Sequence, residues 1–117
     1  MSVQVGVHET LEHLRRRELA HRESGRARAE QLRRRLPEAA ASLRARGARR
    51  IGVFGSLVQG TPSPDCDVDL AVEGLPHEVY FEALAELIRL LGAVDLVRME
   101  EAPDSLRDRI DAEAQWL

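Results

Sequence analysis

The stretch that decides the fold runs from Ile51 to Val72 and reads IGVFGSLVQGTPSPDCDVDLAV. Its first part, Ile51–Phe54, is a mostly apolar run that stops at Gly55-Ser56, as a short buried strand entering a tight turn would. A loop rich in proline, serine and glycine follows, and then a second strand-like run in which polarity alternates. The pattern predicts two short strands joined by a turn and a loop.

Two aspartates, Asp67 and Asp69, lie two residues apart in the second run. Because successive strand side chains face opposite sides, this spacing predicts that both carboxylates lie on one face. Two carboxylates that close repel each other and would hold a proton between them unless a cation lies there. A magnesium site is the simplest interpretation, although an Asp-x-Asp pair alone also fits a solvated strand edge.

The turn at Gly55-Ser56 supplies the other half of such a site. Glycine lets backbone approach a bulky ligand, and Ser56 is predicted to open a short helix that ends at Gly60. Free N–H groups and the positive end of a helix dipole favour phosphate at that position. A Gly-Ser turn alone could be an ordinary turn, but its combination with the aspartate pair indicates a phosphate-binding and metal-binding site.

Gly55-Ser56, ten further residues and then Asp67-x-Asp69 resembles the signature of the DNA polymerase β-like nucleotidyltransferase superfamily. The short chain, and the Leu-x-Val that follows the aspartates, are similar to the minimal nucleotidyltransferases (MNT), which are commonly encoded beside a HEPN-domain partner. The resemblance runs from about Arg50 to the C-terminus. It implies a nucleotidyltransferase fold.

A third carboxylate, Asp95, lies in the strand-like run Val94–Val97. Strand parity alone places it away from the core and favours a solvated edge residue. The resemblance implies instead that Asp95 completes a metal-binding and catalytic trio with Asp67 and Asp69. It also implies that Gly55 and Ser56 hold the β- and γ-phosphates of a nucleotide, with Gln59 as a further candidate contact.

Two residues depart from the pattern of the family that this sequence resembles. Cys66 stands where members often have serine, and Gln59 stands where many have arginine or lysine before the glycine that closes the turn. The change at Gln59 removes a positive charge beside the phosphates, which would weaken triphosphate binding or alter the nucleotide used. Because all three carboxylates are present, we predict an active enzyme.

The function that the resemblance implies is that of an antitoxin. It is a nucleotidyltransferase that uses two Mg²⁺ ions to transfer AMP from ATP to a hydroxyl, expected to be a tyrosine, of a HEPN toxin. Two alternatives remain open. One is a non-catalytic module that neutralises its partner by occlusion through the N-terminal helix. The other is a nucleotidyltransferase that modifies a small molecule.

The composition bounds the protein to one domain of 117 residues with 44% hydrophobic and only 3% aromatic residues, so the core must be aliphatic. The single cysteine, Cys66, excludes an internal disulfide and suits a reducing compartment. No apolar run approaches the roughly 20 residues that cross a bilayer. We expect a soluble, cytoplasmic protein.

The charges are divided between two halves of the chain. Residues 1–50 hold thirteen Arg against six Glu, a balance of +7, whereas residues 51–117 hold four Arg against fourteen Asp and Glu, a balance of −10. An acidic half suits cation-dependent chemistry, and a basic half suits an acidic partner. A homodimer or hetero-oligomer is compatible with this division, whereas nucleic-acid binding is disfavoured because interleaved aromatic residues are missing.

The remaining elements are predicted from periodicity. Residues from about 8 to 46 favour a helix that is interrupted or restarted at Pro37 and that ends near Gly47. A continuous helix of this length would be longer than the domain, so part of it must fold back, project or pack on another chain. This defines an Arg-rich helical extension, 1–47, and a nucleotidyltransferase core, 48–117. The core is predicted to be a small mixed α/β (α+β) sheet with helices on one side. A helix over 78–91 is predicted to bury Tyr80, Ala83, Leu84, Leu87, Ile88 and Leu91. A last helix that begins at Pro103 is predicted to bury Leu106, Ile110 and Leu117.

Overall fold

The computed structural model describes residues 2–58 and 67–117, with side chains from Thr10 onward. Gln59, Gly60 and Cys66 therefore lie outside the described residues. The elements follow one another in the order α1 (Ser2–Ala45), β1 (Arg50–Phe54), η1 (Gly55–Leu57), β2 (Val68–Glu73), η2 (His77–Val79), α2 (Tyr80–Leu91), β3 (Val94–Arg98), η3 (Met99–Glu101), α3 (Asp104–Glu113) and β4 (Gln115–Trp116).

The sheet has four strands in the order β3-β2-β1-β4 and is mixed, as predicted. β1 is antiparallel to both β2 and β4, whereas β2 and β3 are parallel. Parallel neighbours need a crossover, and α2 provides it between β2 and β3. Because of this arrangement, the end of β1 and the beginnings of β2 and β3 meet at the same edge of the sheet.

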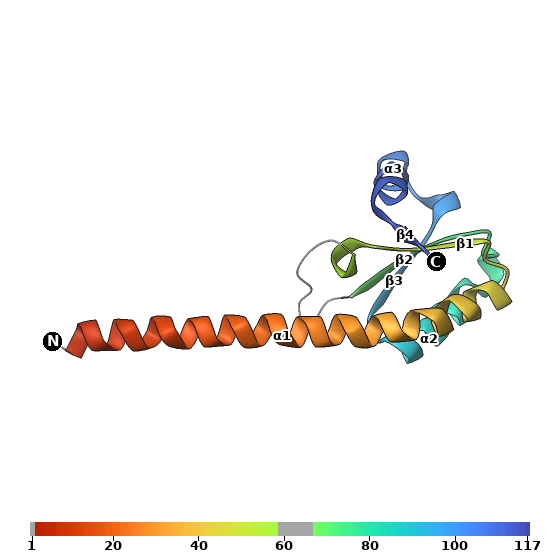
Figure 1. Cartoon of the computed structure of the whole chain (residues 1–117). Helices are drawn as coiled ribbons and strands as arrows, with labels where there is room; N and C mark the ends of the chain where they lie inside the picture. Colours follow the sequence, from red (N-terminus) through yellow and green to blue (C-terminus); the bar gives the residue numbers. More distant parts are fainter. Residues whose placement is uncertain (1, 59–66) are drawn as a thin grey trace.

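Helices cover both faces of the sheet (Figure 1). The larger core, which includes Leu32, Leu43, Ile51, Leu70 and Leu87, joins α1 and α2 to one face. The smaller core joins α3 to the other face through Ile110, Phe54 and Ala71.

The sequence predicted helices on one side only. The placement of α3 corrects this, because alternate residues of β1 and β2 are apolar on both faces and the second face must also be buried.

α1 is one helix from Ser2 to Ala45 with Pro37 inside it, so a new helix does not begin at the proline. The neighbouring residues Leu36, Ala39 and Ala40 are buried against the sheet, and this packing stabilises the turn that a missing N–H weakens. The helix ends as predicted before Gly47, which has a φ of +109°.

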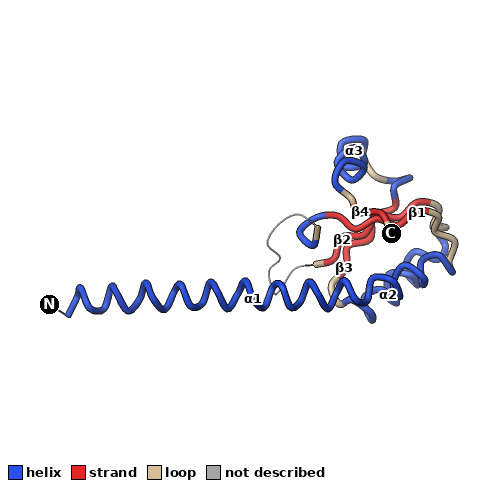
Figure 2. The backbone as a smooth tube through the Cα atoms, viewed as in Figure 1, coloured by secondary structure: helices blue, strands red, loops and turns tan. Residues whose placement is uncertain are grey.

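The N-terminal part of α1 projects past the sheet (Figure 2). The molecule measures 67 × 29 × 20 Å, and every residue from Thr10 to Ser24 is exposed. A helix of this length could fold back, project from the domain or pack on another chain, and in this structure it projects. We call residues 10–24 the arm.

Arginines of the packed half of α1 hold the end of α2. Arg28 donates a hydrogen bond to Leu91 O at 2.9 Å, and Arg35 donates one to Leu90 O at 2.9 Å. These carbonyls belong to the last turn of a helix, where no intrahelical donor is available and a positive charge is favourable. Part of the basic charge of residues 1–50 therefore has a structural use within the chain.

The C-terminus differs from the predicted helix. α3 ends at Glu113, and β4 pairs Trp116 with Gly52 of β1. Leu117, predicted to continue the helical stripe, instead donates its backbone N–H to Ile51 O at 2.8 Å. Pairing satisfies backbone groups that β1 would otherwise leave open at its edge.

No helix within residues 2–58 and 67–117 has the length and apolar character needed to cross a membrane.

Gly52 provides a test of the β1–β4 contact. A Cβ at this position would lie 2.8 Å from the Trp116 ring, so Gly52→Ala must displace β4. We expect the free energy of unfolding to fall by about 1–2 kcal/mol. Urea titration followed by far-UV circular dichroism measures this change, because that signal does not depend on Trp116 and can be recorded with and without it. In a Trp116→Ala background the same substitution should cost much less; an equal cost in both backgrounds contradicts the assignment.

Candidate active site

The predicted site residues meet at the sheet edge where β1 ends and where β2 and β3 begin. Phe54 pairs with Asp69 across the antiparallel β1–β2 ladder, and Asp69 pairs with Asp95 across the parallel β2–β3 ladder. Paired residues of adjacent strands place their side chains on the same face. The register therefore brings Asp69 and Asp95 together, directly beside the turn that follows Phe54.

Gly55 lies against the carboxylate of Asp69. It has a φ of +74°, and a Cβ built on it would lie 2.1 Å from Asp69 Oδ2. Any other residue would strain the backbone at this positive φ, and its Cβ would force the Asp69 carboxylate to move. Glycine thus allows the backbone of the turn to approach an acidic group, in addition to any ligand.

The turn itself is a single 3₁₀ turn, Gly55–Leu57, closed by a hydrogen bond from Val58 N to Gly55 O at 3.1 Å. Ser56 is exposed at the surface of this turn. The predicted end of the helix at Gly60 lies outside the described residues. One turn carries only a small helix dipole, so the groups that it offers to a phosphate are its backbone N–H groups and the Ser56 hydroxyl.

The carboxylates of the site influence one another electrostatically. Burial raises the pKa of the Asp69 carboxyl above its ordinary value, and the charges of Asp95 and then Asp67 raise that pKa further. Asp69 is half-buried, whereas Asp67 and Asp95 are exposed. A raised pKa means that the negative charge at Asp69 is incompletely neutralised by the chain itself.

The three carboxylates are neighbours but do not enclose a metal position. Within residues 2–58 and 67–117, no three His, Cys, Asp or Glu side chains converge closely enough to hold a metal ion. Asp69 and Asp95 nevertheless come from adjacent strands, whose spacing is about 4.8 Å, so rotation of the exposed Asp95 side chain can bring both to one ion. Hard carboxylate oxygens and an unneutralised charge fit a divalent cation such as Mg²⁺.

Arg109 of α3 was not predicted as a site residue. Its guanidinium lowers the pKa of the Asp69 carboxyl, in opposition to the three effects that raise it. Arg109 also donates from Nε to Glu113 Oε2 at 3.2 Å. Position in the sequence does not distinguish it from Arg107, which donates to the carbonyls of Met99 and Ala102. Only the placement of α3 over this face brings Arg109 near the carboxylates.

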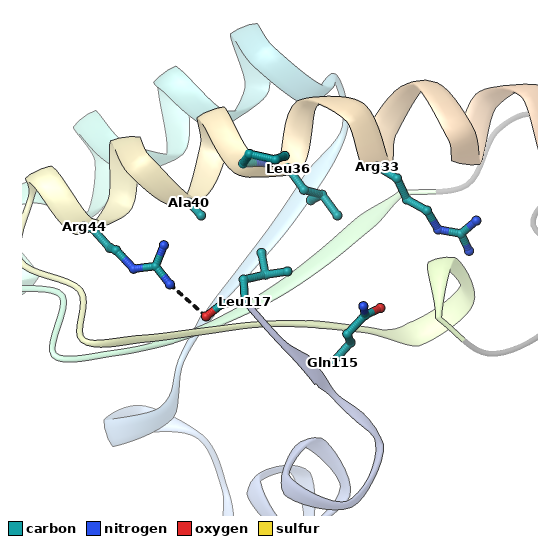
Figure 3. Close-up of a pocket in the computed structure, with 7 residues that line it drawn as sticks. Arg33, Leu36, Ala40, Arg44, Gln115 and Leu117 are labelled. Atoms are coloured by element: carbon teal, nitrogen blue, oxygen red, sulfur yellow. Dashed lines mark hydrogen bonds between the residues drawn. The ribbon is translucent and has the colours of Figure 1, made fainter.

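Arg33 of α1 reaches the same turn from the other side. Its guanidinium donates to Leu57 O, the last residue of the 3₁₀ turn, at 2.9 Å. It also lines a cavity of about 430 Å³ between α1 and the C-terminal strand, where Arg44 donates to Leu117 O (Figure 3). None of the three aspartates lines this cavity, so it is not a substrate pocket of the candidate site.

The comparisons with known proteins identify the class. The profile of the family "Polymerase beta, Nucleotidyltransferase" matches residues 44–117. A solved structure described as a minimal nucleotidyltransferase is 31% identical, with a TM-score of 0.68, and the match covers 76% of this chain and 95% of that one. The chain therefore belongs to the polymerase β nucleotidyltransferase family, among its minimal members, as the sequence motifs predicted.

Two further relatives are a protein adenylyltransferase and a toxin–antitoxin complex. The protein adenylyltransferase MntA of Thermococcus cleftensis is 49% identical over 55 residues, which cover 44% of this chain and 56% of the relative. The chain thus matches little more than half the length of that protein. A solved toxin–antitoxin structure with AMP-PNP is 28% identical, with a TM-score of 0.59, over 66% of this chain and 67% of that one.

The raised pKa of Asp69 predicts a pH-dependent cost to stability. As pH rises above the ordinary value of 3.8, the folded state holds the proton longer than the unfolded state, so stability falls and the full cost is present at neutral pH. In the absence of divalent ions, Asp69→Asn should therefore raise the free energy of unfolding at pH 7, by at most about 1 kcal/mol because solvent screens the half-exposed group. Urea titrations at pH 7 and pH 4 measure it. A gain that does not shrink at pH 4 contradicts the explanation, and Asp104→Asn, at the start of α3, is the control.

The contact between Gly55 and Asp69 predicts a specific defect in Gly55→Ala. The new Cβ must push the carboxylate away, so we expect Mn²⁺ affinity, measured by calorimetry, to fall at least tenfold. Gly74→Ala is the matched control, because Gly74 also has a positive φ, +88°, but its nearest neighbour is the flexible Arg49 side chain. Both variants should lose about 1 kcal/mol of stability from backbone strain. Equal Mn²⁺ affinity in the two variants would refute the assignment.

Proposed function

We propose that this protein is a Mg²⁺-dependent nucleotidyltransferase that transfers AMP from ATP to a hydroxyl of a HEPN-domain toxin and thereby acts as its antitoxin. The acceptor hydroxyl is that of a tyrosine. The reaction belongs in the cytoplasm, where ATP and Mg²⁺ are both supplied.

The observation that carries this proposal is the contact of Asp69 with Gly55 beside Asp95. The turn that begins at Gly55 and the paired carboxylates of Asp69 and Asp95 lie within one residue step of each other across the sheet. Asp67 precedes β2 with the same strand parity as Asp69, and its charge contributes to the raised pKa of Asp69. This arrangement supports a reaction in which divalent ions are bound both by the carboxylates and by a nucleoside triphosphate.

In the proposed reaction, an oxygen of the acceptor hydroxyl attacks the α-phosphorus of ATP. The bond from the α-phosphorus to the bridging oxygen breaks as the new P–O bond forms, and pyrophosphate leaves with that oxygen. Two Mg²⁺ ions, when bound, would neutralise the charge on the entering and leaving oxygens. Asp67 and Asp69 would hold both ions, and Asp95 would hold one of them.

The other residues position the reactants and move the proton. Asp95 is exposed at the sheet edge and accepts the proton of the acceptor hydroxyl. Gly55 and Ser56 bind the β- and γ-phosphates through backbone N–H groups and the serine hydroxyl. Gln59 is a further candidate contact to the triphosphate. Arg109, the cation that acts on Asp69, contributes positive charge on the same side of the sheet.

The protein acceptor is supported by the relatives. MntA of Thermococcus cleftensis is named a protein adenylyltransferase, and the toxin–antitoxin structure was solved with the ATP analogue AMP-PNP. A small-molecule acceptor is less well supported, because the large cavity lies between α1 and β4 and includes none of the aspartates.

The decisive experiment mixes the protein with Mg-ATP and the product of a neighbouring HEPN gene. Intact-mass spectrometry should show a gain of one or more AMP groups on the partner. The double variant Asp67→Ala, Asp69→Ala should lose this transfer by at least 10³-fold, because the ions lose their shared ligands. Chelation by EDTA should do the same in the native protein, and Mg²⁺ should restore it. Asp104→Ala is the control.

Two outcomes would contradict the proposal. If the double variant still neutralises the toxin, occlusion by binding is the better explanation. If the native protein transfers AMP to a small molecule but not to the partner, the chemistry stands and the acceptor is wrong.

A further inference from the structure

Two helical surfaces of this chain expose apolar side chains that nothing within the described residues covers. Among the six exposed large apolar side chains, three lie on the arm and two on α2. On the arm, Leu11, Leu14 and Leu19 are 52%, 50% and 57% exposed. On α2, Phe81 and Ile88 are 76% and 48% exposed. So much exposed apolar surface on two helices indicates a binding surface.

The apolar residues of α2 form one stripe. Phe81, Leu84, Ala85 and Ile88 follow the i, i+3, i+4, i+7 spacing of a helix face that contacts another helix. Periodicity predicted that Ile88 would be buried within the chain. Instead α1 and the sheet cover the opposite side of α2, through Ala83, Leu87, Leu90 and Leu91. The outer stripe is therefore a second apolar face of the same helix.

The apolar residues of the arm also gather on one side. At about 100° per residue, Leu11, Leu14 and Leu19 fall within an arc of roughly 140°. The fifteen residues of the arm span about 22 Å and the twelve of α2 about 18 Å, so the two surfaces match in length. A helix with no tertiary contact is marginal in water, so the arm gains most from a partner.

The charges beside the two surfaces are opposite. Residues 14–22 hold four Arg and one Glu, whereas residues 77–91 hold three Glu and one Arg. Glu18 pairs with Arg22 and Glu86 with Arg89. Among the described residues this leaves Arg15, Arg16 and Arg17 without a carboxylate partner on the arm. Beside the stripe of α2, Glu78 has no ion-pair partner among the described residues, whereas Glu82 is exposed and pairs with Arg46 at 3.5 Å.

We propose that a second copy of this chain covers both surfaces. The arm of each copy packs on the α2 stripe of the other, with its arginines beside Glu78 and Glu82. Such a contact occurs twice about a two-fold axis and closes the assembly as a dimer. The arm cannot reach α2 of its own chain, because α1 is one continuous helix whose C-terminal half already packs on α2 and the sheet, so that the arm points away from the domain (Figure 1).

Sedimentation velocity over about 1–100 µM tests the dimer. The native chain should approach twice its mass of 13.1 kDa. The arm variant Leu11→Gln, Leu14→Gln and the α2 variant Phe81→Gln, Ile88→Gln should each raise the dissociation constant at least tenfold. All four positions are exposed, so far-UV circular dichroism at high concentration should show that the domain remains folded. Leu117→Gln, at the exposed leucine that lies outside both surfaces, is the matched control and should dimerise like the native chain.

An equimolar mixture of the two variants distinguishes the exchanged arm from other modes. The intact arm of one variant then meets the intact α2 of the other, so the mixture should dimerise at concentrations where neither variant does alone. Native association of the α2 variant would mean that arms pack on arms, and native association of the arm variant would mean that α2 packs on α2. Either result overturns the proposal. So does a native chain that is monomeric at about 100 µM, or one that assembles only with a different protein.

Discussion

The candidate site depends on the close approach of the Asp69 carboxylate to the backbone of Gly55. That approach requires the β1–β2 register in which Phe54 lies opposite Asp69, and a slip of one residue would turn Asp69 toward the α1 face. The two cores on either side of the sheet fix the register, because each needs alternate residues of the same strands. Packing of aliphatic side chains thus sets the position of a charged group.

Much of this arrangement follows from local sequence patterns. Alternation in β2 predicts the common face of Asp67 and Asp69, and the change from an apolar run to Gly55-Ser56 predicts the turn. The long helix and the mixed sheet are also confirmed. In each case the determining physics acts between residues close in sequence, where side-chain period and glycine conformation suffice. The roles of the site residues in binding metal and nucleotide remain predictions.

The features that the sequence did not predict are contacts between distant elements. The short strand β4 forms because β1 has an open edge, and α3 covers the second face because Phe54 and Ala71 need burial there. The excess of arginine in residues 1–50 suggested an acidic partner, whereas several arginines of α1 donate to backbone carbonyls of α2 and of the 3₁₀ turn. Arg109 acquires its place beside Asp69 only through the position of α3. The periodicity of a single segment cannot predict contacts between elements that lie far apart in the sequence.

The hydrogen bond from Arg33 to Leu57 O connects α1 to the 3₁₀ turn of the candidate site. Arg33 lies 31 residues from the start of this helix and 12 from its end, so the contact with the turn and the exposed arm belong to one continuous element. A partner that binds the arm therefore holds the same helix that contacts the 3₁₀ turn beside Asp69.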